Sequence, residues 1–518
     1  MSAVAVGTAR AALAHAPRAD GYARRRPEET ELHRVVRAHW PAFLERAEEA
    51  GGLPRFVVRE LDEYLRCGLL EHGLIHLRCG VCGEDLVVAF SCKRRGFCPS
   101  CVARRMNDAA AHLVDDVFPE VPARQWVCSL PWRLRVLLGY DRTLCAEVMT
   151  AFTGAVSRSL RHRAKARLGL PSVDDAHVGA VTFVQRSDSA LRLNVHAHSL
   201  FLDGVYLRAS SGALAFHALG MPTFAEVEQV ARWTHARIQK VLLAHGRTLD
   251  GLGDEPAELT HDQPVLASCY AASAGDVQLL GESAGQRTLK LVQPVRAVRQ
   301  EARALAEYGG VNVHAEVAID GRDRQRLEHV LRYMARPPLA LDRLSLRDDG
   351  QVVYRFKKAW RDGTHGVVLS PEDFIARLCA LVPPPRFHLM RYLGVLAGHS
   401  SLRAEVVPKK AAAPPESPKQ LPLFDEADEP TTSAKSASKK TAEPSRHPWP
   451  WLLQRVFAVD VLKCQKCSGR LRIVEIAKKP DDVSRVLGER GYARAPPRAP
   501  PIAELPVSPH GQLRLVFK

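Results

Sequence analysis

Two histidines at alternate positions of a predicted strand are the side chains best suited to chemistry. Residues 191–202 alternate between apolar and polar types, which is the pattern of a strand with one buried face. His196 and His198 therefore share a face, about 7 Å apart at the backbone, and their rings can converge. Neutral imidazole is the commonest protein ligand of divalent metals, so the pair is a candidate metal site. For an isolated pair, two ordinary half-exposed polar residues would be the more common explanation.

Four cysteines form the sharpest local motif. Cys79 and Cys82 make one C-x2-C pair, and Cys98 and Cys101 make a second pair after 15 intervening residues. This spacing is typical of a four-thiolate zinc site, so we expect all four to hold one structural Zn²⁺. Four thiolates leave no open coordination position, which favours an architectural role. Cys92 lies between the pairs and could replace one ligand or be a spare thiol.

Basic residues surround the cysteine motif and recur further along the chain. A zinc site would stiffen such a cationic surface, which suits contacts with phosphates. The basic run 161–167 is compatible with a solvated helix end and with a DNA contact. The residues that we expect to contact DNA from the zinc-binding region are Lys93, Arg94, Arg95, Arg104 and Arg105.

The overall composition indicates a polyanionic partner. The 518 residues carry a formal charge of +16, and clustered Arg and Lys favour nucleic acid through counterion release. A membrane surface is the weaker alternative because the sequence shows no strongly amphipathic basic helix. No segment approaches the roughly 20 apolar residues of a spanning helix. The first ten residues make a poor signal peptide, so we expect a cytoplasmic protein. In a reducing compartment, the 12 cysteines suit metal binding or burial better than disulfides.

The hydrophobic periodicity predicts a mixture of helices and strands, with 178–185 and 191–202 as adjacent strands of an antiparallel pair. Strands are expected at 126–130, 178–185, 191–202 and 314–319, and Asp203-Gly204 predicts a hairpin turn after the third. Helical periodicity appears within 28–72, 141–167, 223–245 and 323–336.

One tyrosine lies apart from the apolar face of its predicted helix. In the helix 323–336, which Pro337 and Pro338 terminate, the apolar residues form one stripe. Tyr333 falls off that stripe, on the flank with Arg326 and His329. Core packing would not place a tyrosine there, although an amphipathic surface tyrosine is an equally simple explanation.

The composition divides the chain into four parts. We expect a helical and four-cysteine zinc-binding domain at 28–118, a catalytic domain at 125–405, a disordered linker at 406–448 and a small tail module at 449–495. The tail carries Cys464-Gln-Lys-Cys467, which is half of a zinc ribbon. A zinc ion there would need ligands from His447, a partner chain or the N-terminal region.

Taken together, the ordered motifs resemble those of the rolling-circle transposases of the IS91 type, over roughly residues 30–405 and 450–480. The resemblance implies an α+β HUH endonuclease fold, in which a central antiparallel sheet carries a His-hydrophobe-His motif and a helix supplies a tyrosine. Pro337 stands where two-tyrosine members have a second tyrosine, so the chain is similar to the single-tyrosine branch. The motifs are Cys79-Gly-Val-Cys82, Ser91-Cys-Lys93, Cys98-Pro-Ser-Cys101, Asn194-Val-His-Ala-His198, Arg332-Tyr-Met-Ala-Arg336, Tyr354-Arg-Phe-Lys-Lys-Ala-Trp360 and the block 383–396.

The resemblance implies a covalent mechanism of DNA cleavage. His196 and His198 would hold Mg²⁺ or Mn²⁺, and Tyr333 would attack the scissile phosphate to give a 5′-phosphotyrosine. Gln185 on the neighbouring strand is the preferred third ligand, ahead of His329 and Glu328. Arg332 and Arg336 flank the tyrosine and are expected to contact DNA.

The expected function is therefore a bacterial, nucleoid-associated transposase that nicks and rejoins single-stranded element ends. Two alternatives stay open from the sequence. A zinc-dependent regulator would bind DNA without cleaving it, and a plasmid replication initiator of the HUH class would use the same chemistry at a replication origin.

Overall fold

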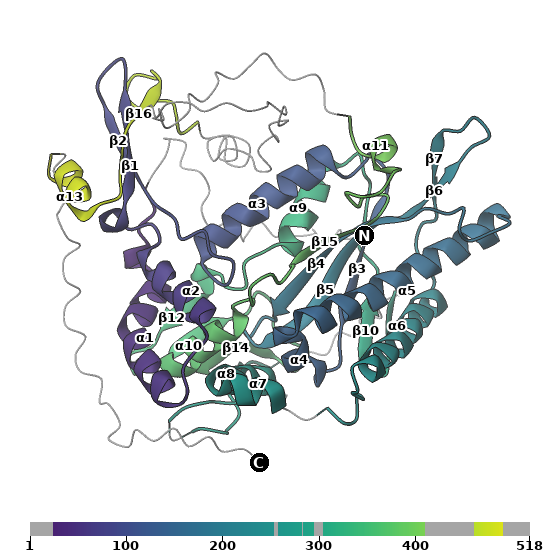
Figure 1. Cartoon of the computed structure of the whole chain (residues 1–518), viewed down its shortest axis with the longest axis horizontal. Helices are drawn as coiled ribbons and strands as arrows, with labels where there is room; N and C mark the ends of the chain where they lie inside the picture. The colour runs from purple at the N-terminus through teal and green to yellow at the C-terminus, as the bar shows by residue number, and fades with distance from the viewer. Residues whose placement is uncertain (1–23, 253–256, 282, 295–303, 410–459, 490–518) are drawn as a thin grey trace, which may run out of the picture.

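A computed structural model describes residues 24–252, 257–281, 283–294, 304–409 and 460–489 (Figure 1). The helices are η1 (Pro27–Glu29), α1 (Glu31–Glu49), α2 (Arg55–Arg66), η2 (Leu70–His72), α3 (Pro99–Asp116), α4 (Leu134–Tyr140), α5 (Arg142–Leu168), α6 (Phe224–Ala244), α7 (Ala257–Asp262), α8 (Pro264–Gly275), α9 (Arg324–Met334), η3 (Leu341–Arg343), α10 (Pro371–Leu381), α11 (Arg403–Val406) and α13 (Pro480–Glu489). The strands are β1 (Leu74–Cys79), β2 (Asp85–Ala89), β3 (Ala123–Ser129), β4 (Gly179–Ser187), β5 (Leu193–Leu202), β6 (Gly204–Arg208), β7 (Leu214–Ala218), β8 (Leu289–Val292), β9 (Leu305–Tyr308), β10 (Val311–His314), β11 (Ala318–Ile319), β12 (Leu344–Leu346), β13 (Val352–Arg355), β14 (Thr364–Leu369), β15 (Met390–Gly394) and β16 (Leu471–Ala477).

The largest sheet runs in the order β15-β4-β5-β3-β10-β9, with β11 paired to β3. Every pairing in it is antiparallel, and β5 lies at its centre between β4 and β3. The predicted α+β class with an antiparallel sheet is therefore confirmed. The strands expected around 126–130, 178–185 and 191–202 are β3, β4 and β5, and the region 314–319 contributes the end of β10 and β11.

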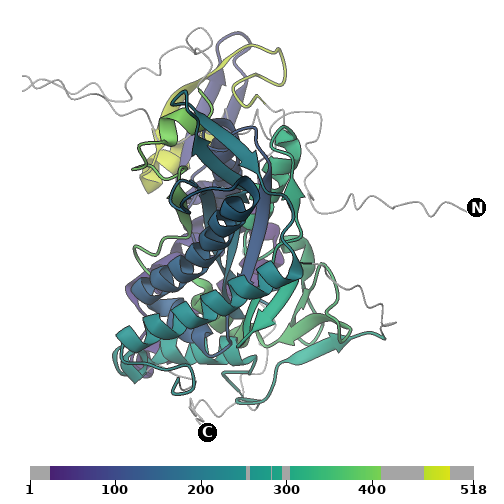
Figure 2. The ribbon, with the colours of Figure 1, turned by 90° about the vertical axis from the view of Figure 1, so that its right-hand side faces the viewer.

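The two faces of this sheet are covered by different helices, and the alternation of β5 decides which residues face which layer. Val195, Ala197 and Phe201 pack into the large core on the side of α4, α5 and α8. Leu200 and Leu202 pack into a second core with α3 and α9. Side chains alternate between the two faces of a strand, so His196 and His198 lie on the same face of β5 as Leu200. That face is the one covered by α9. Figures 1 and 2 show the long helices α5 and α6 on one side of the sheet.

Helix α9 is held in place along its whole length. Its buried residues are Leu327, Val330, Leu331 and Met334, the apolar stripe expected from the sequence. At the helix N-terminus the Asp323 carboxylate caps the backbone N–H of Arg326, at 2.9 Å. The guanidinium of Arg324 donates to carbonyls at the end of α3, including Phe118 O at 2.9 Å. Because both the face and the start of α9 are fixed, its last turn has a defined position.

The prediction of a hairpin turn at Asp203-Gly204 is wrong. β6 follows β5 at once but leaves the main sheet and pairs with β7. Asp203 is buried and accepts two hydrogen bonds from Arg124, at 3.0 and 2.7 Å, so it anchors the end of β5 instead of turning the chain. A Cβ at Gly204 would lie 2.2 Å from His217 O, so glycine is required for the close approach of β7.

The Arg124–Asp203 pair gives a test of this corner of the sheet. We expect Asp203→Asn to lower the free energy of unfolding by about 3–5 kcal/mol, because the buried Arg124 cation would lose its counter-charge. The exposed pair Arg347–Asp349, at 3.1 Å, is the matched control, and Asp349→Asn should cost less than about 1 kcal/mol. Urea unfolding of both variants checks the difference, and equal effects would contradict this role for Arg124.

Smaller elements surround this body. β12-β13-β14-β8 form a second sheet, beside α1 and α10. α1 and α2 are the helices expected within 28–72. The hairpin β1–β2 projects from the N-terminal region, and β16, from the far end of the chain, adds to it as a third strand (Figures 1 and 2). The greater part of the expected linker 406–448, with His447, lies outside the described residues. No helix in the described ranges is long and apolar enough to cross a bilayer.

Candidate functional site

The predicted histidine pair lies at the centre of the main sheet. His196 is paired with Gln185 on β4 and with Ser129 on β3, so the pair is flanked on both sides by strand backbone. The rings of His196 and His198 have centroids 5.0 Å apart. His198 is buried and His196 is half-buried. The two imidazoles thus converge, as the strand alternation predicts.

Tyr333, in the last turn of α9, lies against His198 of this pair. Its ring centroid is 6.0 Å from that of His198, with the rings nearly perpendicular. The guanidinium carbon of Arg336 lies 4.5 Å from the centroid of the Tyr333 ring. Tyr333 is 42% exposed, so its phenol contacts the imidazole layer on one side and solvent on the other. A phenol open to solvent and next to two imidazoles can be reached by a large substrate.

Hydrogen bonds fix the orientation of both imidazoles. His196 Nδ1 donates to Asn194 O at 2.8 Å, because a carbonyl oxygen can only accept. Its Nε2 is therefore the nitrogen with the free lone pair. His198 Nδ1 lies 2.9 Å from the side-chain amide nitrogen of the buried Gln125 on β3. An amide can donate through nitrogen or accept through oxygen after a half-turn, so Gln125 holds the His198 ring in either tautomer. Gln125 was not among the residues that the sequence singled out.

The surroundings favour the neutral form of both histidines. Burial lowers the pKa of His196. The pKa of His198 lies well below its ordinary value, first because of burial and then because of the neighbouring His196 and Arg336. Neutral imidazole is the form that binds a metal ion. Arg135 is a further cation close enough to disfavour a charge on His196, and its Nε is buried without a hydrogen-bond partner among the described residues.

Gln185, the preferred third ligand, lies across from His196. Its amide nitrogen donates to Met334 O at 2.8 Å and lies 3.4 Å from Tyr333 O. The amide nitrogen thus ties the last turn of α9 to β4. Within the described ranges, no third His, Cys, Asp or Glu joins the pair in a ligand group, which disfavours His329 and Glu328. Glu328 instead pairs with Arg332.

Other tyrosines are poorly placed to replace Tyr333. Tyr354 is 2% exposed, and its hydroxyl accepts the Ala340 N–H at 3.1 Å. Burial raises its pKa. Tyr392 is half-buried on β15, opposite Val181, and burial raises its pKa as well. Neither tyrosine has a ring contact with the histidine pair among the contacts that the structure shows.

The cysteines form two groups, which differ from the expected set of Cys79, Cys82, Cys98 and Cys101. The first, here the inner cysteine group, has all its Sγ atoms within 4.8 Å of one another. Sγ–Sγ distances in it are 3.4–3.7 Å, close to the roughly 3.8 Å of a tetrahedron with 2.3 Å Zn–S bonds. The inner cysteine group consists of Cys67, Cys92, Cys98 and Cys101.

The prediction that Cys79, Cys82, Cys98 and Cys101 hold one ion is therefore wrong. Cys79 and Cys82 lie at the tip of the β1–β2 hairpin, whereas Cys98 and Cys101 begin α3. Five residues of β2 carry the chain back from that tip, a distance of about 17 Å at 3.3 Å per residue. Cys92 replaces one expected ligand. Cys67, at the end of α2, was missed because it belongs to no C-x2-C pair.

Several basic residues of the zinc-binding region have partners within the protein. Arg94 forms an ion pair with Glu63, Arg95 donates to Phe387 O at 3.2 Å, and Arg105 donates to Lys93 O at 2.6 Å. Arg95 thereby ties this region to the segment before β15. Lys93 and Arg104 are exposed.

The basic run 161–167 contributes both to contacts within the protein and to the lining of a recess. Arg163 is buried and donates to Leu219 O at 3.1 Å, and Lys165 donates to Pro171 O at 2.9 Å. Arg161 instead lines an open recess together with Arg158 and Arg237, between α5 and α6. The recess is cationic, which suits a phosphate backbone.

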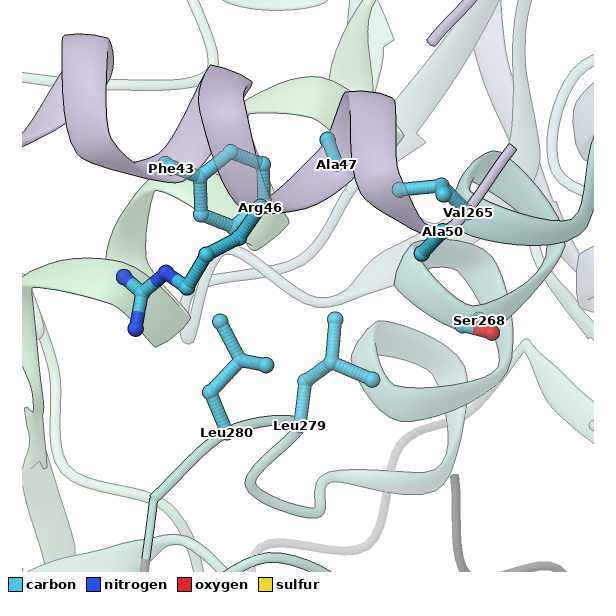
Figure 3. A pocket seen from close by; sticks show the side chains of 8 residues that line it. All are labelled: Phe43, Arg46, Ala47, Ala50, Val265, Ser268, Leu279 and Leu280. Carbon is cyan, nitrogen blue, oxygen red and sulfur yellow. The ribbon is translucent and has the colours of Figure 1, made fainter. Parts of the chain in front are cut away.

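A small recess between α1 and α8 is not a substrate site (Figure 3). Phe43, Val265, Leu279 and Leu280 line it, and Arg46 is its single charged residue. It contains no pair of groups that could do acid–base, nucleophilic or metal chemistry. The catalytic candidates remain with the histidine pair.

Comparison with known families agrees with this arrangement. Residues 179–403, which include β4, β5 and α9, match a family model described as a putative transposase. Residues 35–130 match a model described as a transposase zinc-binding domain, and the whole inner cysteine group lies within that range. The protein is thus a transposase with an N-terminal zinc-binding region.

One relative of known function is also a transposase. The transposase for insertion sequence element IS801 of Pseudomonas savastanoi pv. phaseolicola is 24% identical over 380 residues, covering 72% of this chain and 78% of that protein. No solved structure matches the chain. The two family models and this relative together support an IS91-type transposase with an N-terminal zinc-binding region.

Proposed function

We propose that this transposase nicks and rejoins single-stranded DNA at element ends through a 5′-phosphotyrosine, and so drives rolling-circle transposition. The observation that carries the proposal is the contact between the ring of Tyr333 and the imidazole of His198. It brings a solvent-accessible nucleophile to a neutral histidine pair. A phenol and two imidazoles on separate elements have no packing reason to converge at a half-open surface.

The chemistry at Tyr333 conserves the energy of the phosphodiester. The phenolic oxygen attacks phosphorus, a P–O bond forms, and the bond from phosphorus to the 3′ oxygen breaks. The phenol loses its proton, and the departing 3′ oxygen gains one. Because the new ester stores the bond energy, attack by a 3′-hydroxyl can reverse the step without ATP. Arg336, against the Tyr333 ring, is placed to bind the phosphate and to stabilise a phenolate.

The donor set suits a divalent ion. Nε2 of His196 and of His198, with the oxygen of Gln185, would offer two nitrogens and one oxygen and leave positions for a phosphate. Such an ion would polarise the scissile phosphate and offset the charge developing on it. Mn²⁺ suits a mixed nitrogen and oxygen set better than Mg²⁺, so we expect Mn²⁺ to support the higher activity.

Gln125 is a positioning residue in this scheme. For His198 to bind a metal through Nε2, its Nδ1–H must donate to the Gln125 amide oxygen. We expect Gln125→Leu to raise the Mn²⁺ concentration for half-maximal nicking by about 10–100-fold, as for other groups that orient metal ligands. Gln125→Glu keeps an acceptor and should restore most of the affinity. A metal titration checks this, and equal half-maximal concentrations for wild type and Gln125→Leu would remove Gln125 from the scheme.

The surroundings of the site suit a single strand. Trp132 is 51% exposed and lies three residues beyond Ser129, which pairs with His196. An exposed indole next to Arg133, at 5.6 Å, is a platform on which a base can stack. Arg135, two residues beyond Arg133, is half-buried and lies close enough to His196 to lower the pKa of that imidazole, and in this scheme it would bind a phosphate. Lys93 and Arg104 would extend the contact across the zinc-binding region.

Incubation with a single-stranded element end and Mn²⁺ tests the proposal. We expect a protein–DNA complex that survives denaturation and carries the strand downstream of the nick. The same sequence as a duplex should give much less, because the bases cannot reach the platform. Binding without any covalent complex, at every metal concentration tried, would instead indicate a non-catalytic DNA-binding regulator.

A further inference from the structure

The remaining C-x2-C pairs come together from opposite ends of the chain. Cys79 Sγ lies 3.5 Å from Cys467 Sγ, and Cys82 Sγ lies 3.6 Å from Cys464 Sγ. All four Sγ atoms, here the outer cysteine group, are within 4.8 Å of one another. These distances are far longer than the roughly 2.05 Å of a disulfide and close to the roughly 3.8 Å expected around Zn²⁺. The family zinc-binding match ends at residue 130 and contains only half of this group.

The N-terminal half of the group is a tight turn. The Cys79 N–H donates to Glu84 O at 2.8 Å, and the Gly83 N–H donates to Cys79 O at 3.1 Å. Gly83 has φ +73°, in the left-handed region that glycine adopts without strain. The turn aims Cys79 and Cys82 to one side, as a ligand pair requires.

The C-terminal half repeats the same turn, residue for residue. The Cys464 N–H donates to Gly469 O at 2.7 Å, and the Ser468 N–H donates to Cys464 O at 2.9 Å. Ser468, in the place of Gly83, has φ +60°, which is unusual for a residue with a side chain. Such a conformation persists where the surroundings demand it. Two turns with matching hydrogen bonds, facing each other, form the frame of a four-thiolate zinc ribbon.

The two halves also pack against each other closely. A Cβ at Gly469 would lie 2.8 Å from Val81 Cγ2 and 3.0 Å from Cys79 Sγ, so the opposite turn leaves no room for a side chain. β16 pairs antiparallel with β1 from Leu74↔Ala477 to Cys79↔Leu471. The buried apolar residues beside the sulfurs are few, chiefly Leu77 and Leu471. A second small cluster further along the hairpin joins it to β16 and α13, through Leu70, Leu74, Val87, Ala477, Val483, Val486 and Leu487. Modules with cores of this size usually need a metal or a disulfide as well.

We propose that the outer cysteine group binds a second structural Zn²⁺, with two ligands from each end of the chain, and that this ion holds residues 460–489 on the β1–β2 hairpin. The ion closes a chain of more than 380 residues between its ligand pairs. It thereby makes the tail a part of the N-terminal zinc-binding region. The inference does not depend on the chemistry at Tyr333.

The zinc content of the full chain tests the proposal. Wild type should hold two Zn²⁺ per chain, one in each group. The variants Cys79→Ser/Cys82→Ser and Cys464→Ser/Cys467→Ser should each hold one, and the variant with all four changes should still hold one. This non-additive loss is the mark of a single ion shared by both pairs. Cys269→Ala, which removes a buried sulfur outside both groups, is the control and should keep two.

Hydrogen exchange of the same proteins gives a second readout. In Cys464→Ser/Cys467→Ser, the amides of β16 and β1 should lose protection, while those of α3, beside the inner cysteine group, should keep it. One Zn²⁺ in wild type would overturn the proposal, and that result does not require any variant to fold. Two Zn²⁺ in Cys464→Ser/Cys467→Ser would overturn it as well.

Discussion

Tyr333→Phe should abolish the covalent protein–DNA complex, a decrease on the order of 10³-fold or more, while DNA binding persists. The change removes only the oxygen that would attack phosphorus. It leaves the ring that contacts His198 and Arg336, so the packing of α9 should not change. The measurement is the yield of denaturation-resistant complex on single-stranded element ends with Mn²⁺, beside a binding assay.

Tyr308 provides a closely matched control. It is 38% exposed, its ring lies 5.4 Å from that of His235 at a nearly perpendicular angle, and Arg232 lies 4.4 Å from its centroid. The same three kinds of side chain meet there without a histidine pair. Tyr308→Phe should therefore give a normal yield of complex. A normal yield of the complex from Tyr333→Phe would show that another residue is the nucleophile.

His196→Ala and His198→Ala should each reduce nicking by about 10³-fold, because loss of a ligand removes several kcal/mol of charge stabilisation in the transition state. His235→Ala is the matched control, since that ring contacts Tyr308 and lies outside the candidate site. The rate of nicking with Mn²⁺, and again with EDTA, measures the effect. Wild-type nicking that continues at full rate in EDTA would contradict a metal at the histidine pair.

Local patterns predicted the elements of this site well. The alternation of 191–202 placed His196 and His198 on one face, and the 3.6-residue stripe of α9 placed Leu327 and Met334 inside and Tyr333 outside. These properties depend on neighbours in sequence, where periodicity is informative. The meeting of α9 with β5 is a tertiary contact, and only the resemblance to a family predicted it. Gln125 could not be identified, because its role depends on β3 lying beside β5.

The cysteines show where sequence spacing misleads. Two C-x2-C pairs 15 residues apart predicted one ion, but a hairpin separates them and each pair finds its partners elsewhere. Proximity along the chain is therefore a poor guide when a strand pair lies between ligands. The unpaired motif Cys464-x-x-Cys467 was the available signal, since half a ribbon requires another half. The hairpin turn predicted at Asp203-Gly204 was also wrong. There the buried ion pair of Asp203 with Arg124 outweighs the turn propensity of the dipeptide.

The most direct test is to locate the covalent bond. Wild-type protein is allowed to react with a single-stranded element end and Mn²⁺, the DNA is digested with nuclease, and tryptic peptides are analysed by mass spectrometry. The account predicts a nucleotide on the peptide 333–343, in which Tyr333 is the only tyrosine. A nucleotide on a peptide containing Tyr354 or Tyr392 instead, with 333–343 unmodified, would contradict it.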